Sequence, residues 1–203
     1  FINTSRGGVV DTASLRKALT QGQVGSCVLD VWENEPGIDP DLLGIVTIGT
    51  PHIAGYSMEG KANAVRMIRE AVCKHFGIAS SWDPSTEFSA MEKSEITVSQ
   101  DRPQPESVLH DIVSKSYDIA LDDRMLRGLT GVSPGDRGAY FRKLRSGYRV
   151  RREFSHANVR LPRRHAHLRD IIVALGFNCT IVADAPVIDR REEQQSNKKE
   201  IMK

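Results

Sequence analysis

Three side chains of complementary chemistry, Arg6, Glu35 and His52, each follow a short apolar stretch of the sequence. A guanidinium can hold a substrate carboxylate through two parallel hydrogen bonds and polarise a neighbouring oxygen. An imidazole can take up or release a proton near neutral pH, and a carboxylate bonded to its second ring nitrogen fixes the tautomer. Brought together, these three groups predict a site for redox chemistry at a hydroxyl beside a carboxylate.

Each of these side chains also has an ordinary structural interpretation. Arg6 could be a surface arginine in a turn, and His52, which follows a proline, could cap the next helix. Asp30 could end a strand with a turn-forming side chain. Glu33 lies two residues before Glu35 and competes with it as the partner of the imidazole. The residue types alone therefore leave structural roles open.

The elements that must position these residues indicate an open α/β sheet. Apolar runs at residues 1–3, 24–31 and 45–48 predict strands, and Asp11 and Ser57 can cap the two helices that follow the first and third of them. This alternation predicts part of a Rossmann-type, doubly wound parallel sheet. Ligands bind at the carboxyl ends of such strands, so the three loops are expected to meet at one edge.

Composition divides the chain into segments. Residues 1–77 form the α/β unit, which ends in a helix with an apolar stripe, and residues 78–104 predict a linker rich in Ser, Asp, Glu and Pro with a short strand at 96–99. Residues 105–186 predict a second, compact α/β unit of α+β character, whose last part reads as strand, helix, strand. Residues 187–203 are polar and predict a disordered, solvated tail.

The overall composition argues against several functional classes. A net charge of +2, from 28 basic and 26 acidic side chains, predicts neither a nucleic-acid partner nor a membrane partner. Three widely separated cysteines indicate reduced thiols in a cytoplasmic protein, with no zinc or other metal site. The sequence contains no apolar run long enough for a membrane span, and we expect no secretion signal.

The blocks Asn3–Asp11, Leu29–Pro36 and Thr50–Gly55 resemble, in order and spacing, the signature blocks of the D-isomer-specific 2-hydroxyacid dehydrogenases. The chain is accordingly identified as similar to that family of NAD-dependent oxidoreductases.

The resemblance assigns roles to individual residues. Arg6 would orient the substrate, Glu35 would pair with the histidine, and His52 would donate and accept the proton. Asp30 would face the nicotinamide end of NAD, and Gly55 would lie against the cofactor.

One branch of the family is matched more narrowly, over the run His52–Lys61 and over the second unit. In that branch the tyrosine after the glycine contacts a small phosphorylated hydroxy acid, which makes Tyr56 a substrate-binding candidate, and the C-terminal domain forms a homodimer. The alternatives are a phosphoglycerate or glyoxylate type of dehydrogenase, and a non-catalytic dimerisation module that kept the motifs by descent.

A basic run from Arg142 to Arg169 has ten basic side chains and one acidic side chain, Glu153. Such runs are usually solvated faces. The resemblance suggests a sharper hypothesis, in which Arg151 or Arg152 reaches the partner subunit's site and binds the substrate phosphate. A nucleic-acid interpretation ranks below both, because few stacking aromatic residues are interleaved with the charges.

The sequence lacks the family's phosphate-binding pattern G-x-G-x-x-G. We therefore expect this chain to be the C-terminal part of a longer protein, with the phosphate loop and the substrate-binding domain upstream. By itself it is expected to bind NAD weakly or not at all and not to turn over.

Overall fold

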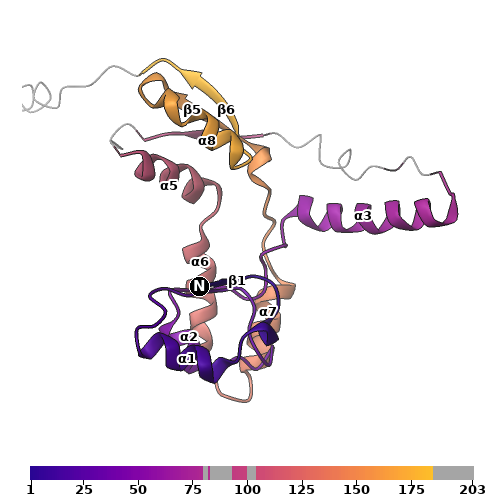
Figure 1. Ribbon diagram of the computed structural model, residues 1–203, viewed down its shortest axis with the longest axis vertical. Helices are drawn as coiled ribbons and strands as arrows, with labels where there is room; N and C mark the ends of the chain where they lie inside the picture. Colours follow the sequence, from indigo (N-terminus) through magenta and orange to yellow (C-terminus); the bar gives the residue numbers. More distant parts are fainter. Residues whose placement is uncertain (80–81, 83–92, 100–103, 185–203) are drawn as a thin grey trace, which may run out of the picture.

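The computed structural model describes residues 1–79, 82, 93–99 and 104–184 (Figure 1). Most of the expected linker and the whole expected tail at 187–203 lie outside the described residues.

The first of two three-stranded sheets in the described part of the chain is parallel, as the sequence predicts. Its strands are β1 (Ile2–Asn3), β2 (Val28–Leu29) and β3 (Ile48–Gly49), in the order β1-β2-β3. The 3-10 helix η1 (Gly7–Val9) and helix α1 (Thr12–Thr20) follow β1, and helix α2 (Pro40–Ile45) follows β2. All three strands therefore end at one edge of the sheet.

A side chain just before each of these two helices caps its first turn. Asp11 accepts a hydrogen bond from the backbone N–H of Ser14 at the start of α1, and Asp39 accepts from the N–H groups of Asp41 and Leu42 at the start of α2. These contacts satisfy donors that the first turn of a helix leaves without partners. The expected cap at Asp11 is confirmed.

The second sheet is also parallel, in the order β4-β5-β6, with strands β4 (Ser94–Thr97), β5 (Ala157–Pro162) and β6 (Asn178–Val182). It carries α5 (Pro105–Ser116), the short η3 (Phe154–His156) and η4 (Arg163–Leu168), and α8 (Arg169–Ala174). Its core contains Ile96, Val108, Ile112, Val159 and Ile172. The predicted α/β fold class is thus confirmed for both sheets.

Three helical segments between the two sheets pack against the first sheet. They are α6 (Ile119–Arg127), η2 (Gly128–Gly131) and α7 (Arg137–Ser146). Their buried side chains Leu126, Leu129 and Phe141 belong to the same core as Leu29 and Trp32.

Polar contacts fasten α6 to the same sheet. Arg127 donates to the carbonyl oxygens of Leu43 and Val46 at 2.8 and 2.9 Å, and Asp123 accepts from the N–H of Gly49 at 2.7 Å. This packing differs from the predicted grouping of residues 105–186 as one unit. Helical periodicity identified the apolar faces but carries no information on which sheet they cover.

Helix α3 (Met58–Phe76) extends away from both cores (Figure 1). Ser57 caps its start by accepting from the N–H of Gly60, as predicted, and Gly77 ends it in the left-handed conformation with φ of 66°. Within residues 1–79, none of its side chains is buried, and Val65 and Ile68 are 56% and 69% exposed. No helix in the described residues has the length and apolar character needed to cross a membrane.

Candidate active site

His52 and Glu35 meet directly at the carboxyl edge of the first sheet, where the loops after β2 and β3 lie together. The Nδ1 atom of His52 lies 2.7 Å from Oε2 of Glu35, and both side chains are partly buried. The other oxygen of Glu35 accepts from the backbone N–H of Trp32 at 2.8 Å, which fixes the carboxylate. No residue of the described chain hydrogen-bonds Nε2 of His52, so this atom is available for proton transfer.

Glu33, the competing carboxylate, is used elsewhere. Its Oε2 atom accepts from the backbone N–H of Thr12 at 2.9 Å and so satisfies a donor at the start of α1. The structure therefore pairs His52 with Glu35, the partner that the sequence motif favours.

Asp30 is 3% exposed and holds the loop that carries His52. Its carboxylate accepts from the hydroxyl of Thr50 at 2.7 Å and from the N–H groups of Ile53 and Ala54 at 2.8 and 3.0 Å. Buried carboxylates need such partners. The role of Asp30 in this structure is thus to organise the loop, and a contact with the nicotinamide remains a proposal.

Arg6 lies at the same edge, on the loop after β1. Asn3 shapes this loop by donating to the carbonyl of Arg6 and accepting from the N–H and hydroxyl of Ser5. The guanidinium of Arg6 is exposed and donates to the carbonyl of Ser5 at 2.7 Å. Within residues 1–79 no hydrogen bond joins Arg6 to Glu35 or His52.

Gly7 brings the Arg6 loop against the loop that carries Glu35. A Cβ atom built on Gly7 would lie 1.9 Å from the carbonyl oxygen of Trp32, so only glycine allows the two backbones to approach this closely. The structure therefore packs the loop that carries Arg6 against the loop that carries Glu35.

Tyr56 lies among cations, four residues after His52. Its hydroxyl accepts from Nη2 of Arg145 at 3.0 Å, and Nζ of Lys61 lies 4.4 Å from the centre of its ring. The edge-to-face ring of Tyr148 lies 6.0 Å away. The neighbouring Gly55 is exposed, and a Cβ there would meet nothing within 4 Å. The surface around Gly55 and Tyr56 is therefore open and positively charged.

Arg151 and Arg152, the candidates for binding a substrate phosphate, have partners within the chain. Nη2 of Arg151 donates to the carbonyl oxygens of Ile53 and Ala54, and Nε of Arg152 lies 2.5 Å from a carboxylate oxygen of Glu59. Both arginines therefore make contacts within the chain. No short sequence pattern pointed to these contacts, because they join residues about a hundred positions apart.

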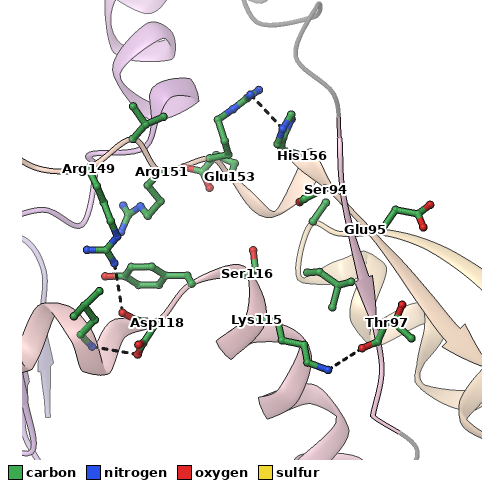
Figure 2. A pocket seen from close by; sticks show the side chains of 16 residues that line it. Ser94, Glu95, Thr97, Lys115, Ser116, Asp118, Arg149, Arg151, Glu153 and His156 are labelled. Atoms are coloured by element: carbon green, nitrogen blue, oxygen red, sulfur yellow. Dashed lines mark hydrogen bonds between the residues drawn. The ribbon is translucent and has the colours of Figure 1, made fainter.

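A cleft of about 680 Å³ opens beside this segment, between β4, the end of α5 and residues 149–157 (Figure 2). In Figure 2 the Arg149 and Arg151 side chains lie together on one side and Lys115 on another. Lys115 is held by Asp111 and the carbonyl of Thr97, and the cleft lining does not include the His52 site. No group of residues in the described chain is arranged to hold a metal ion.

A buried carboxylate anchors the wall of this cleft. Asp122 is 2% exposed and accepts from the hydroxyls of Tyr117 and Tyr148 at 2.7 and 2.9 Å, and it pairs with Arg149. Burial raises the pKa of the Tyr117 hydroxyl, and the hydrogen bond to Asp122 raises it further. Burial likewise raises the pKa of the Tyr148 hydroxyl, so both phenols are held as protonated donors to Asp122.

Two segments of the chain match known protein families. Residues 1–54 match the family described as "D-isomer specific 2-hydroxyacid dehydrogenase, NAD binding domain", and residues 89–176 match a domain of unknown function, DUF3410. The first segment of the chain is therefore similar to the NAD-binding domain of the D-isomer-specific 2-hydroxyacid dehydrogenases.

The similar curated proteins share one enzyme name. An erythronate-4-phosphate dehydrogenase of Cellvibrio japonicus is 40% identical over 88% of this chain and 48% of its own length. Enzymes with the same name from Salinibacter ruber and from Escherichia coli O1:K1 are 39% and 41% identical, over 78% and 88% of this chain and 41% and 45% of their own lengths. The chain spans about half the length of the curated relatives it matches.

Proposed function

We propose that this chain supplies the proton-transfer site of an NAD-dependent oxidation of 4-phosphoerythronate. The product is 2-oxo-3-hydroxy-4-phosphobutanoate, and the reaction belongs to pyridoxal 5'-phosphate biosynthesis. The observation that carries the proposal is the 2.7 Å contact between His52 and Glu35 at the sheet edge. The similarity to erythronate-4-phosphate dehydrogenases supports the choice of substrate.

His52 removes the proton of the C2 hydroxyl through Nε2. Glu35 holds the Nδ1–H tautomer and stabilises the imidazolium that forms, because a carboxylate is the stronger partner for a charged ring. Arg6 binds the substrate carboxylate and polarises the C2 oxygen as it becomes a carbonyl. NAD, when bound, accepts the hydride from C2.

The residues present fit such a cofactor. The edge beside His52 is open at Gly55, where no side chain fills the space above the backbone. Asp30 and Gly55 are the residues of this chain that would lie against it. Tyr56 would contact the substrate, and the neighbouring cations Lys61 and Arg145 suit a phosphorylated substrate.

We further propose a cytoplasmic homodimer that assembles through residues 105–186. Both proposals rest on the resemblance described above, and the match of residues 89–176 to DUF3410 supports a distinct C-terminal domain.

Assay of the complete protein that the gene encodes tests the proposal. We expect NADH formation with 4-phosphoerythronate and much slower turnover with 3-phosphoglycerate or glycerate. Faster turnover of either of those acids would assign the protein to another branch of the family. Dimerisation without any NADH formation would support a non-catalytic module instead.

A further inference from the structure

The loop that carries His52 is held from two sides. On the sheet side, the backbone carbonyl of Asp30 accepts from the N–H of His52 at 2.7 Å. The carboxylate of Asp30 accepts from the N–H groups of Ile53 and Ala54 at 2.8 and 3.0 Å. On the outer side, Nη2 of Arg151 donates to the carbonyl oxygens of Ile53 and Ala54 at 3.1 and 2.7 Å. The two peptide units after the imidazole are therefore fixed at both their N–H and C=O groups.

This loop has a conformation that must be held. His52 has a φ of 57°, in the left-handed region that residues with a side chain rarely adopt. Such a conformation costs on the order of 1–2 kcal/mol and persists when neighbouring groups fix it. The direction of the imidazole toward Glu35 depends on this backbone angle, so contacts that stabilise the loop also align the ring.

Arg151 is itself held in place by a rigid cluster. Its guanidinium lies 4.7 Å from the ring centre of Tyr117 and 5.8 Å from that of Tyr148. The hydroxyl groups of both tyrosines donate to the buried carboxylate of Asp122. A guanidinium over two fixed aromatic rings loses little further freedom when it binds the loop carbonyls.

The neighbours of Arg151 reinforce the same junction. The carbonyl of Arg151 accepts from the backbone N–H of Met58 at 2.9 Å, and the hydroxyl of Ser57 donates to Glu153. The backbone N–H of Glu153 donates to Glu59 at 3.0 Å. The segment around Arg151 thus lies along the start of α3, directly after the His52 loop. These contacts keep Arg151 next to the loop.

We infer that Arg151 is a positioning residue that holds the His52 loop in its active conformation from the outer side. This inference rests on the proposed function for its catalytic consequence, but the contact itself is a property of this chain. It also assigns Arg151 a different role from phosphate binding. Because the guanidinium donates to two backbone carbonyls of the loop, it is used to hold the loop and to align the imidazole.

Amide hydrogen exchange of the chain tests the contact without any need for catalysis. We expect Arg151→Ala to speed exchange at Ile53 and Ala54 by about tenfold, corresponding to about 1.4 kcal/mol, while Leu43 in α2 is unchanged. Arg151→Lys should restore part of the protection, because an ammonium can donate to the carbonyls but lacks the planar fork. Arg160→Ala is the matched control, since this exposed arginine of the same basic run pairs with Glu95.

Kinetics of the complete protein test the consequence. We expect Arg151→Ala to lower kcat by roughly tenfold to a hundredfold, with KM for the hydroxy acid within about twofold of the parent value, because misalignment affects the chemical step. Arg151→Lys should recover part of kcat.

Two results would overturn the inference. One is unchanged exchange at Ile53 and Ala54 in Arg151→Ala, and the other is a raised KM with unchanged kcat, which would make Arg151 a substrate-binding residue. If the alanine variant does not fold, the same readouts on Arg151→Lys decide. If the parent protein shows no turnover, the proposed function fails, while the exchange data still decide whether Arg151 holds the loop.

Discussion

Glu35 reaches His52 across the carboxyl edge of the first sheet, with Oε2 of the carboxylate 2.7 Å from Nδ1 of the imidazole. The second carboxylate oxygen is bound to the N–H of Trp32, so the glutamate cannot turn away without losing a backbone partner. Within the described residues, no hydrogen bond occupies Nε2 of the ring. Proton transfer at that atom is the property on which the proposed chemistry depends.

Replacement of the carboxylate tests this pairing. We expect Glu35→Gln in the complete protein to lower kcat by about 10²-fold or more, because an amide cannot stabilise the imidazolium as a carboxylate does. The matched control is Glu33→Gln, whose amide oxygen can still accept from the N–H of Thr12. Equal losses in both variants would show that the effect is structural.

The close approach of the Arg6 loop to the Glu35 loop gives a second test. A methyl group on Gly7 would collide with the backbone of Trp32, whereas one on Gly8 would meet nothing within 4 Å. We expect Gly7→Ala to lower the free energy of unfolding by about 1–3 kcal/mol, the usual cost of overpacking. Gly8→Ala should change it by less than about 1 kcal/mol. Urea denaturation followed by tryptophan fluorescence measures both, and equal stabilities would contradict the contact.

The tyrosine hydroxyl beside the loop gives a third test. If Tyr56 contacts substrate, Tyr56→Phe should raise KM for the phosphorylated acid by about tenfold or more, as expected when a hydrogen bond to a charged group is lost. The phenylalanine ring keeps the packing against Tyr148. Tyr140→Phe is the control, because its hydroxyl donates to the carbonyl of Met125 away from the site. An unchanged KM in Tyr56→Phe would leave this residue a packing role only.

Much of the site follows from the sequence because its determinants are local. Asp11 and Ser57 were expected to cap helices, since short polar side chains satisfy the first N–H groups, and both do so. The strand-end rule for parallel sheets placed Glu35 and His52 at one edge. Each of these inferences depends on residues within a few positions or on one general property of the fold.

The rest depends on contacts that no local pattern encodes. The apolar face of α7 predicts burial, but nothing in its spacing says that Phe141 packs with Trp32 in the first core. Arg151 reads as one more charge in a basic run, and its target lies about a hundred residues earlier in the chain. Such pairings are set by the whole topology.

The acid response of the junction at the start of α3 gives a fourth test. Burial raises the pKa of Glu59, but hydrogen bonds from Arg152 and from the N–H of Glu153 outweigh it and hold the pKa below its ordinary value of 4.5. A carboxylate with a lowered pKa in the folded state stabilises that state fully above its unfolded value. The contribution is lost as pH falls below 4.5 and through the folded value.

Urea denaturation across this range measures the effect. We expect Glu59→Gln to be less stable than the parent by about 1–3 kcal/mol at pH 7, the usual worth of hydrogen bonds to a charged group, with the difference shrinking as pH falls below 4.5. Glu70→Gln removes a carboxylate of the same helix that pairs with Arg66 at the surface, where ion pairs contribute little. This control should differ from the parent by less than about 1 kcal/mol at every pH. A gap between the parent and Glu59→Gln that stayed constant with pH would show that the charge of Glu59 does not stabilise the junction.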